Sequence, residues 1–160
     1  MGLNEYDTKF IDLFLKSIET SFMNVFQCEL QRGQIYFMRN QLSEDNVAIL
    51  TGVVGKEYTG MVVYRMHNAM AQRMVDFLDP TVNDSSSRLM TYEGLGEVIN
   101  IISGNTMTRF SKDNIFLNIT TPSIIAGDTI ELFLLNQITI SADMLSPFGT
   151  MEINLAIKHY

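Results

Sequence analysis

The sequence has few of the residues that build disulfides and metal sites. Its 160 residues include a single cysteine, Cys28, and two histidines, His67 and His159. One cysteine excludes an intrachain disulfide and a zinc site made of several thiolates. The two histidines are too few and too isolated to suggest a catalytic triad or a histidine metal site. We therefore expect any catalysis to depend on carboxylates, amides and hydroxyls.

Positive charge is also scarce. The chain has 11 lysines and arginines against 18 aspartates and glutamates, which gives a formal net charge of −7. Proteins that bind nucleic acid present a basic surface that displaces counterions from the phosphates. The acidic balance argues against a nucleic-acid partner and favours a protein or a small molecule.

Long hydrophobic runs are missing. None approaches the roughly 20 residues that a membrane-spanning helix needs. Residues 1–10 also lack the basic stretch and the apolar run of a signal peptide. We therefore expect a cytoplasmic protein that does not contact the membrane.

The composition is otherwise that of a globular protein, with 46% hydrophobic and 18% charged residues. A chain of this length suits one folded unit, so we expect a single domain over residues 1–160. Apolar residues at helical spacing predict helices, and runs of β-branched and aromatic residues predict strands. The predicted helices cover residues 4–26, 67–78 and 88–110. The predicted strands cover residues 34–38, 46–54, 58–66, 115–121, 129–141 and 151–158, with a loop at 83–87 and turns at 122–128 and 146–149.

This order of elements repeats one pattern, a long helix followed by three strands, with a short helix between the two copies. The two halves share this pattern and no obvious letters, so an internal duplication is a hypothesis. Strands and helices do not alternate as in βαβ units. The sequence therefore predicts an α+β fold of two pseudo-duplicated helix-plus-three-strand units, with a largely antiparallel six-stranded sheet and long helices packed on it.

Helical spacing divides the predicted helix 88–110 into two faces. The apolar face carries Leu95, Val98, Ile99, Ile102 and Phe110. The other face carries Glu97, Ile101, Gly104 and Thr108, with Glu93 and Asn100 beside them. Residues three apart on a helix are neighbours, so the carboxylate of Glu97 and the carboxamide of Asn100 can bind one target together.

Three glycines interrupt the same helix. Gly94, Gly96 and Gly104 each cost about 1 kcal/mol relative to alanine, which a solvated helix rarely tolerates without a reason. Gly94 and Gly104 flank the Glu97 side, where a missing side chain lets another backbone approach. Close packing of the helix on its own sheet is the alternative, and it is strongest for Gly96.

The segment GEVINIISGN, residues 96–105, resembles the Glu-x-x-Asn signature of the CheC, CheX and FliY phosphatases. The resemblance covers most of the chain and includes the segments at 120–127 and 146–149. CheC-type members carry two such motifs and CheX-type members carry one, in the second half. Glu97 is the only glutamate followed three residues later by asparagine; Glu19, in the first helix, is followed at that spacing by Phe22. The sequence therefore resembles the CheX type.

This resemblance implies a phosphatase that hydrolyses the aspartyl phosphate of a CheY-type response regulator in chemotaxis. It implies that Asn100 positions the attacking water and that Glu97 forms a salt bridge with the lysine of the receiver's active site. The neighbouring Glu93, Ile101, Gly104 and Thr108 are predicted to contact the receiver. The Mg²⁺ ion is expected in the receiver, and this chain is expected to bind no cofactor.

Two alternatives remain from other classes of function. The chain could be a non-catalytic receiver-binding or flagellar-switch-type module of the same fold, since fold does not determine function. It could also bind a small molecule through some of its eleven methionines, although methionine usually fills cores. The candidates for such a site are Met61, Met66, Met70, Met74 and Met90.

We also expect a homodimer. The resemblance implies one, and a small domain with apolar strands such as 116–121 or 132–140 risks an unpaired sheet edge.

Overall fold

The computed structural model describes residues 5–37, 45–81, 88–134 and 138–160. The predicted loop at 83–87, and residues 4 and 38 at the ends of two predicted elements, lie outside these ranges. The helices are α1 (Glu5–Phe26), α2 (Asn68–Leu78) and α3 (Arg88–Lys112). The strands are β1 (Gln31–Phe37), β2 (Val47–Gly55), β3 (Tyr58–Met66), β4 (Leu117–Ile119), β5 (Ser123–Ala126), β6 (Ile140–Ser146) and β7 (Gly149–His159).

The strands form one sheet in the order β1-β6-β7-β3-β2-β4, with β5 also paired to β2. Every pairing is antiparallel. The two halves of the chain occupy equivalent places in this order. Exchanging β1 with β4, β2 with β6 and β3 with β7 gives the same order read from the other edge of the sheet. The structure thus confirms the α+β fold with a largely antiparallel sheet, and its pairing follows the predicted repetition.

The sheet has seven strands, so the predicted number of six is wrong. The predicted strand 115–121 is reduced to β4, and β5 lies within the predicted turn at 122–128. Pro122 separates the two, and proline has no N–H to donate to a ladder. The hydroxyl of Thr120 accepts the N–H of Gly52 at 2.8 Å, and the chain then pairs with β2 again. Pairing across the sheet therefore overrides the local turn signals.

The predicted strand 129–141 is also wrong. Residues 131–134 form no strand, residues 135–137 lie outside the described part of the chain, and β6 begins only at Ile140. β6 also extends to Ser146, the first residue of the predicted turn at 146–149. Ile130 forms a single bridge, and the apolar residues after it cover the sheet instead of joining it, since Leu132 and Leu134 pack with Ile130 on Ala48 and Val63. Alternating apolar residues cannot distinguish these two ways of burying side chains.

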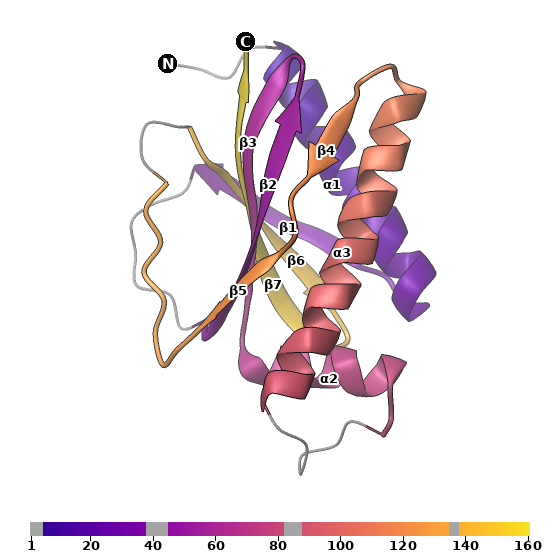
Figure 1. Ribbon diagram of the computed structural model, residues 1–160, viewed down its shortest axis with the longest axis vertical. Helices are drawn as coiled ribbons and strands as arrows, with labels where there is room; N and C mark the ends of the chain where they lie inside the picture. The colour runs from indigo at the N-terminus through magenta and orange to yellow at the C-terminus, as the bar shows by residue number, and fades with distance from the viewer. Residues whose placement is uncertain (1–4, 38–44, 82–87, 135–137) are drawn as a thin grey trace.

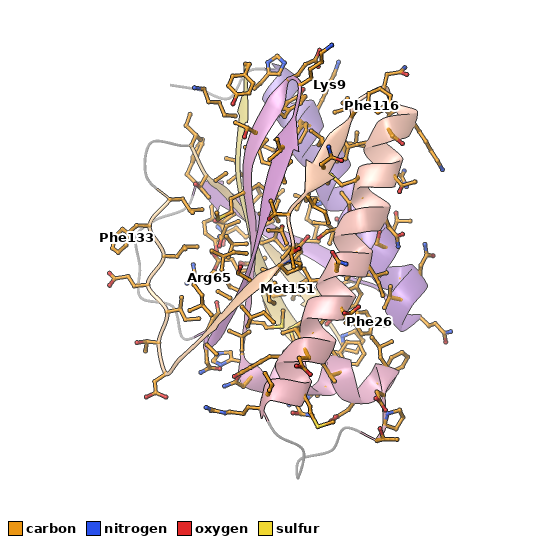
Figure 2. The ribbon with its side chains drawn as sticks, viewed as in Figure 1. Lys9, Phe26, Arg65, Phe116, Phe133 and Met151 are labelled. Atoms are coloured by element: carbon orange, nitrogen blue, oxygen red, sulfur yellow. The ribbon has the colours of Figure 1, made fainter. Side chains whose placement is uncertain are left out.

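All three helices pack on one face of the sheet, and the segment after β5 crosses the other (Figure 1). The helical face holds the main core. Five of its largest buried side chains come from α1, because Phe14, Leu15, Ile18, Phe22 and Phe26 recur at helical spacing and face the sheet. The segment after β5 includes Phe133, and Arg65 of β3 is buried on that side of the sheet (Figure 2). None of the helices in the described ranges is long and apolar enough to span a membrane.

Candidate functional site

Helix α3 carries the Glu-x-x-Asn segment and packs its apolar face on the sheet. The five residues predicted to face the core are buried, namely Leu95, Val98, Ile99, Ile102 and Phe110. One polar contact lies within this apolar interface, because the hydroxyls of Ser103 and Tyr64 of β3 are 3.3 Å apart. Burial raises the pKa of Tyr64 to about 12, so this tyrosine is neutral at physiological pH. A buried hydroxyl without a partner is costly, so this pair favours one position of α3 along the sheet.

Helix α2 holds the first half of α3 from the side. The hydroxyl of Thr91 donates to Gln72 Oε1 at 2.9 Å, and the hydroxyl of Tyr92 donates to Asn68 Oδ1 at 3.0 Å. A Cβ on Gly94 would lie 3.0 Å from Val75 Cγ1. Helix α2 therefore occupies the space that a side chain on Gly94 would fill, so packing within the chain accounts for this glycine.

The other two glycines differ from Gly94. A Cβ on Gly96 would lie 3.6 Å from Ile124 Cδ1 of β5, so this residue packs against the chain's own sheet. Beyond the adjacent backbone of α3, a Cβ on Gly104 would have no neighbour within 4 Å among the described residues. Packing against those residues therefore does not explain why this position is a glycine.

The exposed face of α3 presents the remaining residues that the sequence singles out. Glu93, Glu97, Asn100, Ile101 and Thr108 are all exposed. The hydroxyl of Thr108 donates to the carbonyl oxygen of Gly104 at 3.0 Å, so this hydroxyl is already engaged. Within the described ranges, the side chains of Glu97 and Asn100 have no hydrogen-bond or ion-pair partner. Both side chains are one helical turn apart and accessible from solvent.

Glu93, Glu97 and Asn100 line one wall of a groove of about 860 Å³ that runs beside α3, which we call the α3 groove. Thr121, Pro122, Ile124 and Ala126, in and before β5, line the other wall. The groove continues past Leu89 and Met90 at the start of α3 to Val75 of α2 and to Asp79, the residue just after that helix. The motif therefore lies in a groove with two walls and not on an isolated helix surface.

Sequence reasoning missed the second wall and the apolar end of this groove. The segment 120–127 stands out in the sequence only as part of the resemblance, because a turn prediction does not place it beside α3. In the sequence, Leu89 reads as an ordinary apolar residue of a helix and Met90 stands out only as a candidate for a small-molecule site, although 64% and 48% of their surfaces are exposed. Helical spacing alone does not reveal that α2 and the sheet leave these two side chains uncovered.

The groove does not contain the ligands of a metal site. Across the described ranges, no three histidine, cysteine, aspartate or glutamate side chains lie close enough to hold a metal ion. The chemical groups that the site offers are a carboxylate, a carboxamide and backbone and hydroxyl dipoles. Such groups can position a water and bind a cation from a partner, and they need no ion of their own.

Comparison with known families identifies the chain. The family described as chemotaxis phosphatase CheX matches residues 47–141, more than half of the sequence and all of α3. The chain belongs to the CheX family. No curated protein matches the sequence.

Solved structures share the CheX fold over nearly the whole chain. A CheC-like superfamily protein from Shewanella sp. PV-4 is 19% identical, with a TM-score of 0.82 over 98% of this chain and 99% of the other. The chemotaxis protein CheX from Desulfovibrio desulfuricans is 19% identical, with a TM-score of 0.78 over 95% and 99%. A chain of the CheX–CheY–BeF3–Mg²⁺ complex from Borrelia burgdorferi is 22% identical, with a TM-score of 0.76 over 93% and 97%. At these identities the structures establish a common fold.

Proposed function

We propose that this CheX-family protein accelerates the hydrolysis of the aspartyl phosphate of a CheY-type response regulator. The observation that carries the proposal is the pair formed by Glu97 and Asn100, exposed one turn apart on α3 within a groove. Membership of a family described as chemotaxis phosphatases supports the activity. The Borrelia burgdorferi structure of the same fold, a CheX–CheY complex, supports a CheY-type receiver as the partner.

The proposed roles follow from the chemistry of the two side chains. Water attacks the phosphorus in line with the bond to the aspartate oxygen; that bond breaks, and phosphate and a free carboxylate are released. Phosphoryl transfer of this kind depends on positioning and electrostatics more than on covalent chemistry. The carboxamide of Asn100 can accept a hydrogen bond from the water while its N–H donates to a phosphoryl oxygen, and neither step needs ionisation. The carboxylate of Glu97 binds the receiver's lysine and holds α3 against the phosphorylated site.

The metal ion of this reaction belongs to the receiver. Mg²⁺ would be held there by the receiver's own carboxylates, and this chain would contribute no ligand. The protein would work in the cytoplasm, where a receiver of this type is found, and as a homodimer.

Phosphate release from a phosphorylated CheY-type receiver tests the proposal. The receiver is phosphorylated with a small phosphodonor, freed from the excess, and mixed with this protein in Mg²⁺ buffer. We expect phosphate to appear faster than from the receiver alone, with a rate that saturates as this protein is added. Binding of the receiver without faster release would replace the enzyme with a non-catalytic receiver-binding module. Absence of binding to every CheY-type receiver of the source organism would overturn the partner as well.

A further inference from the structure

The α3 groove extends well beyond the two residues assigned to the reaction. Its end nearest α2 is formed by Leu89 and Met90, whose surfaces are 64% and 48% exposed. Large apolar side chains gathered at the end of a groove are typical of a surface that another protein covers. This end is continuous with Glu97 and Asn100 along α3, so a molecule bound at the motif reaches it without crossing another element.

The second wall of the groove is held in place by the sheet. Thr120, just before the wall, exchanges hydrogen bonds with Gly52 of β2 through its hydroxyl at 2.8 Å and its N–H at 3.0 Å. Ile124 is half-buried against Gly96, whereas Thr121 is exposed at the rim. The wall therefore has a defined position relative to Asn100, and it limits which surfaces can reach that side chain.

The charged residues that line the groove all have the same sign. Asp79, Glu93 and Glu97 are exposed carboxylates, and none of the described residues in the lining is basic. A complementary surface carries basic side chains over these carboxylates and apolar side chains over Leu89 and Ile124. Because most of the lining is exposed, the groove suits the surface of a protein better than an enclosed small molecule.

We propose that the phosphorylated receiver covers the whole α3 groove, and that Leu89 and the wall at Thr121 determine which receivers bind productively. This inference rests on the proposed function and adds the extent of the contact and its chemistry. The receiver's face around the phosphorylated aspartate would combine basic residues, paired with Asp79, Glu93 and Glu97, with apolar residues on the two walls. These remote contacts are the same in the ground state and the transition state, so they would contribute to affinity and leave turnover unchanged.

Two variants at the groove and two matched controls test this contact. Leu89→Ser removes the exposed apolar side chain, and its control Met23→Ser changes another exposed apolar residue, on α1 and outside the groove. Thr121→Trp fills the groove from its second wall, and its control Asn118→Trp adds the same bulk to an exposed position of β4 outside it. Thermal unfolding of all four variants verifies that they fold.

The dissociation constant is measured with the receiver loaded with beryllofluoride and Mg²⁺, and KM and kcat are measured with the phosphorylated receiver. We expect Leu89→Ser and Thr121→Trp to raise the dissociation constant and KM about fivefold or more, with kcat within twofold of the original protein. Both controls are expected to leave all three values unchanged.

The outcomes separate this inference from the proposed function. If the original protein binds the receiver and both groove variants bind it equally well, the inference is overturned and the proposed function stands. If the groove variants weaken binding although the original protein does not speed phosphate release, the inferred contact along the groove is supported and the proposed phosphatase activity is rejected. A change of oligomeric state in Leu89→Ser with unchanged receiver binding would assign the groove to a second copy of the chain and overturn the inference.

Discussion

Glu97 presents a carboxylate and Asn100 presents a carboxamide to solvent, one turn apart on α3. Their chemistry differs, because only the carboxylate can form an ion pair and only the carboxamide can both donate and accept hydrogen bonds at neutral pH. The two residues are therefore expected to act at different steps of the proposed reaction, and their variants are expected to fail in different ways.

Glu97→Ala is expected to weaken binding of the receiver. Loss of a charged hydrogen bond at a partly desolvated contact costs on the order of 1 to 3 kcal/mol of binding free energy. The rate defect is then expected to shrink as the protein concentration rises, which a titration of phosphate release against protein concentration measures. Glu57→Ala, at another exposed glutamate, is the control. A defect that persists at saturation would assign Glu97 to the chemical step.

Asn100→Ala is expected to lower turnover about 100-fold or more while binding persists. The contact with the attacking water is realised mainly in the transition state, so its loss reduces kcat and not affinity. Single-turnover phosphate release at saturating protein measures this effect. Asn24→Ala, at an exposed asparagine of α1, is the matched control. Hydrolysis at the original rate in a saturated Asn100→Ala complex would refute the catalytic assignment.

At the scale of the element, α3 combines glycines with opposite surroundings. Gly94 lies against Val75 of α2, and Gly104 lies against open space. A helix gains about 0.5 to 1 kcal/mol when an exposed glycine is replaced by alanine. Replacing each glycine by alanine therefore distinguishes a glycine that the packing of the fold requires from a glycine that a partner could contact.

Gly104→Ala is expected to raise the free energy of unfolding by about that amount and to weaken receiver binding, because the new methyl group occupies space that the partner's backbone would use. Gly94→Ala is expected to bring no such gain in stability, since Val75 must move to accept a Cβ at 3.0 Å. Urea unfolding and the dissociation constant of the receiver complex measure the two effects. Gly104→Ala with unchanged affinity would mean that the receiver does not approach α3 at this point.

The burial of Tyr64, whose hydroxyl lies 3.3 Å from that of Ser103 of α3, makes the free energy of unfolding depend on pH. Burial holds the pKa of Tyr64 at about 12, against about 10 in an unfolded chain. Between these pH values the folded state keeps a proton that the unfolded state has lost, so the free energy of unfolding falls as pH rises, by up to about 1.4 kcal/mol per unit. This contribution is complete below pH 10 and is lost toward pH 12.

Tyr64→Phe removes both the hydrogen bond and the titration. The variant is expected to be less stable than the original protein by about 1 kcal/mol at pH 8, where the hydrogen bond is intact. This difference is expected to shrink or reverse above pH 10, because only the original protein loses the Tyr64 contribution there. Urea unfolding of both proteins at pH 8 and pH 10.5 measures it. Parallel pH profiles for the two proteins would contradict a buried, neutral Tyr64.

At the scale of the whole molecule, the sheet order is symmetric about the central pair β3 and β7. One edge is β1, and the other is formed by β4 and β5, which both pair with β2. Apolar side chains are exposed near both ends: Ile35 and Phe37 on β1, and Phe116 just before β4. Phe116 lies near the end of α3 that is farther from α2 (Figure 2). Exposed apolar edges favour association, which proteins otherwise prevent with charge or coverage.

We accordingly expect the protein to be a homodimer at micromolar concentration. Sedimentation equilibrium is expected to give twice the chain mass of 18.2 kDa. Introducing charge at an edge is expected to shift the equilibrium toward the monomer if that edge forms the contact, so Phe37→Lys and Phe116→Lys test the two edges separately. A monomer at these concentrations would reject the expectation.

Local periodicity in the sequence is enough to predict the helices, the class of fold and the face of α3 that carries the motif. Residues at helical spacing share a face whatever surrounds them, so these features need no knowledge of distant contacts. Glu97 and Asn100 belong to the exposed side for this reason, since Leu95, Val98 and Ile99 occupy the other.

What each element meets depends on the tertiary structure. Apolar residues form β5 against β2 in one segment, but in the next they leave 131–134 as a cover on the sheet, because pairing depends on which edge is open. Gly94 and Gly104 read alike in sequence, and α2 alone distinguishes them. The second wall of the α3 groove comes from residues more than twenty positions after Asn100, brought there by pairing with β2. The local sequence determines which side chains of a segment can be buried. Contacts between distant segments determine which side chains remain exposed, and the α3 groove is lined mostly by such side chains.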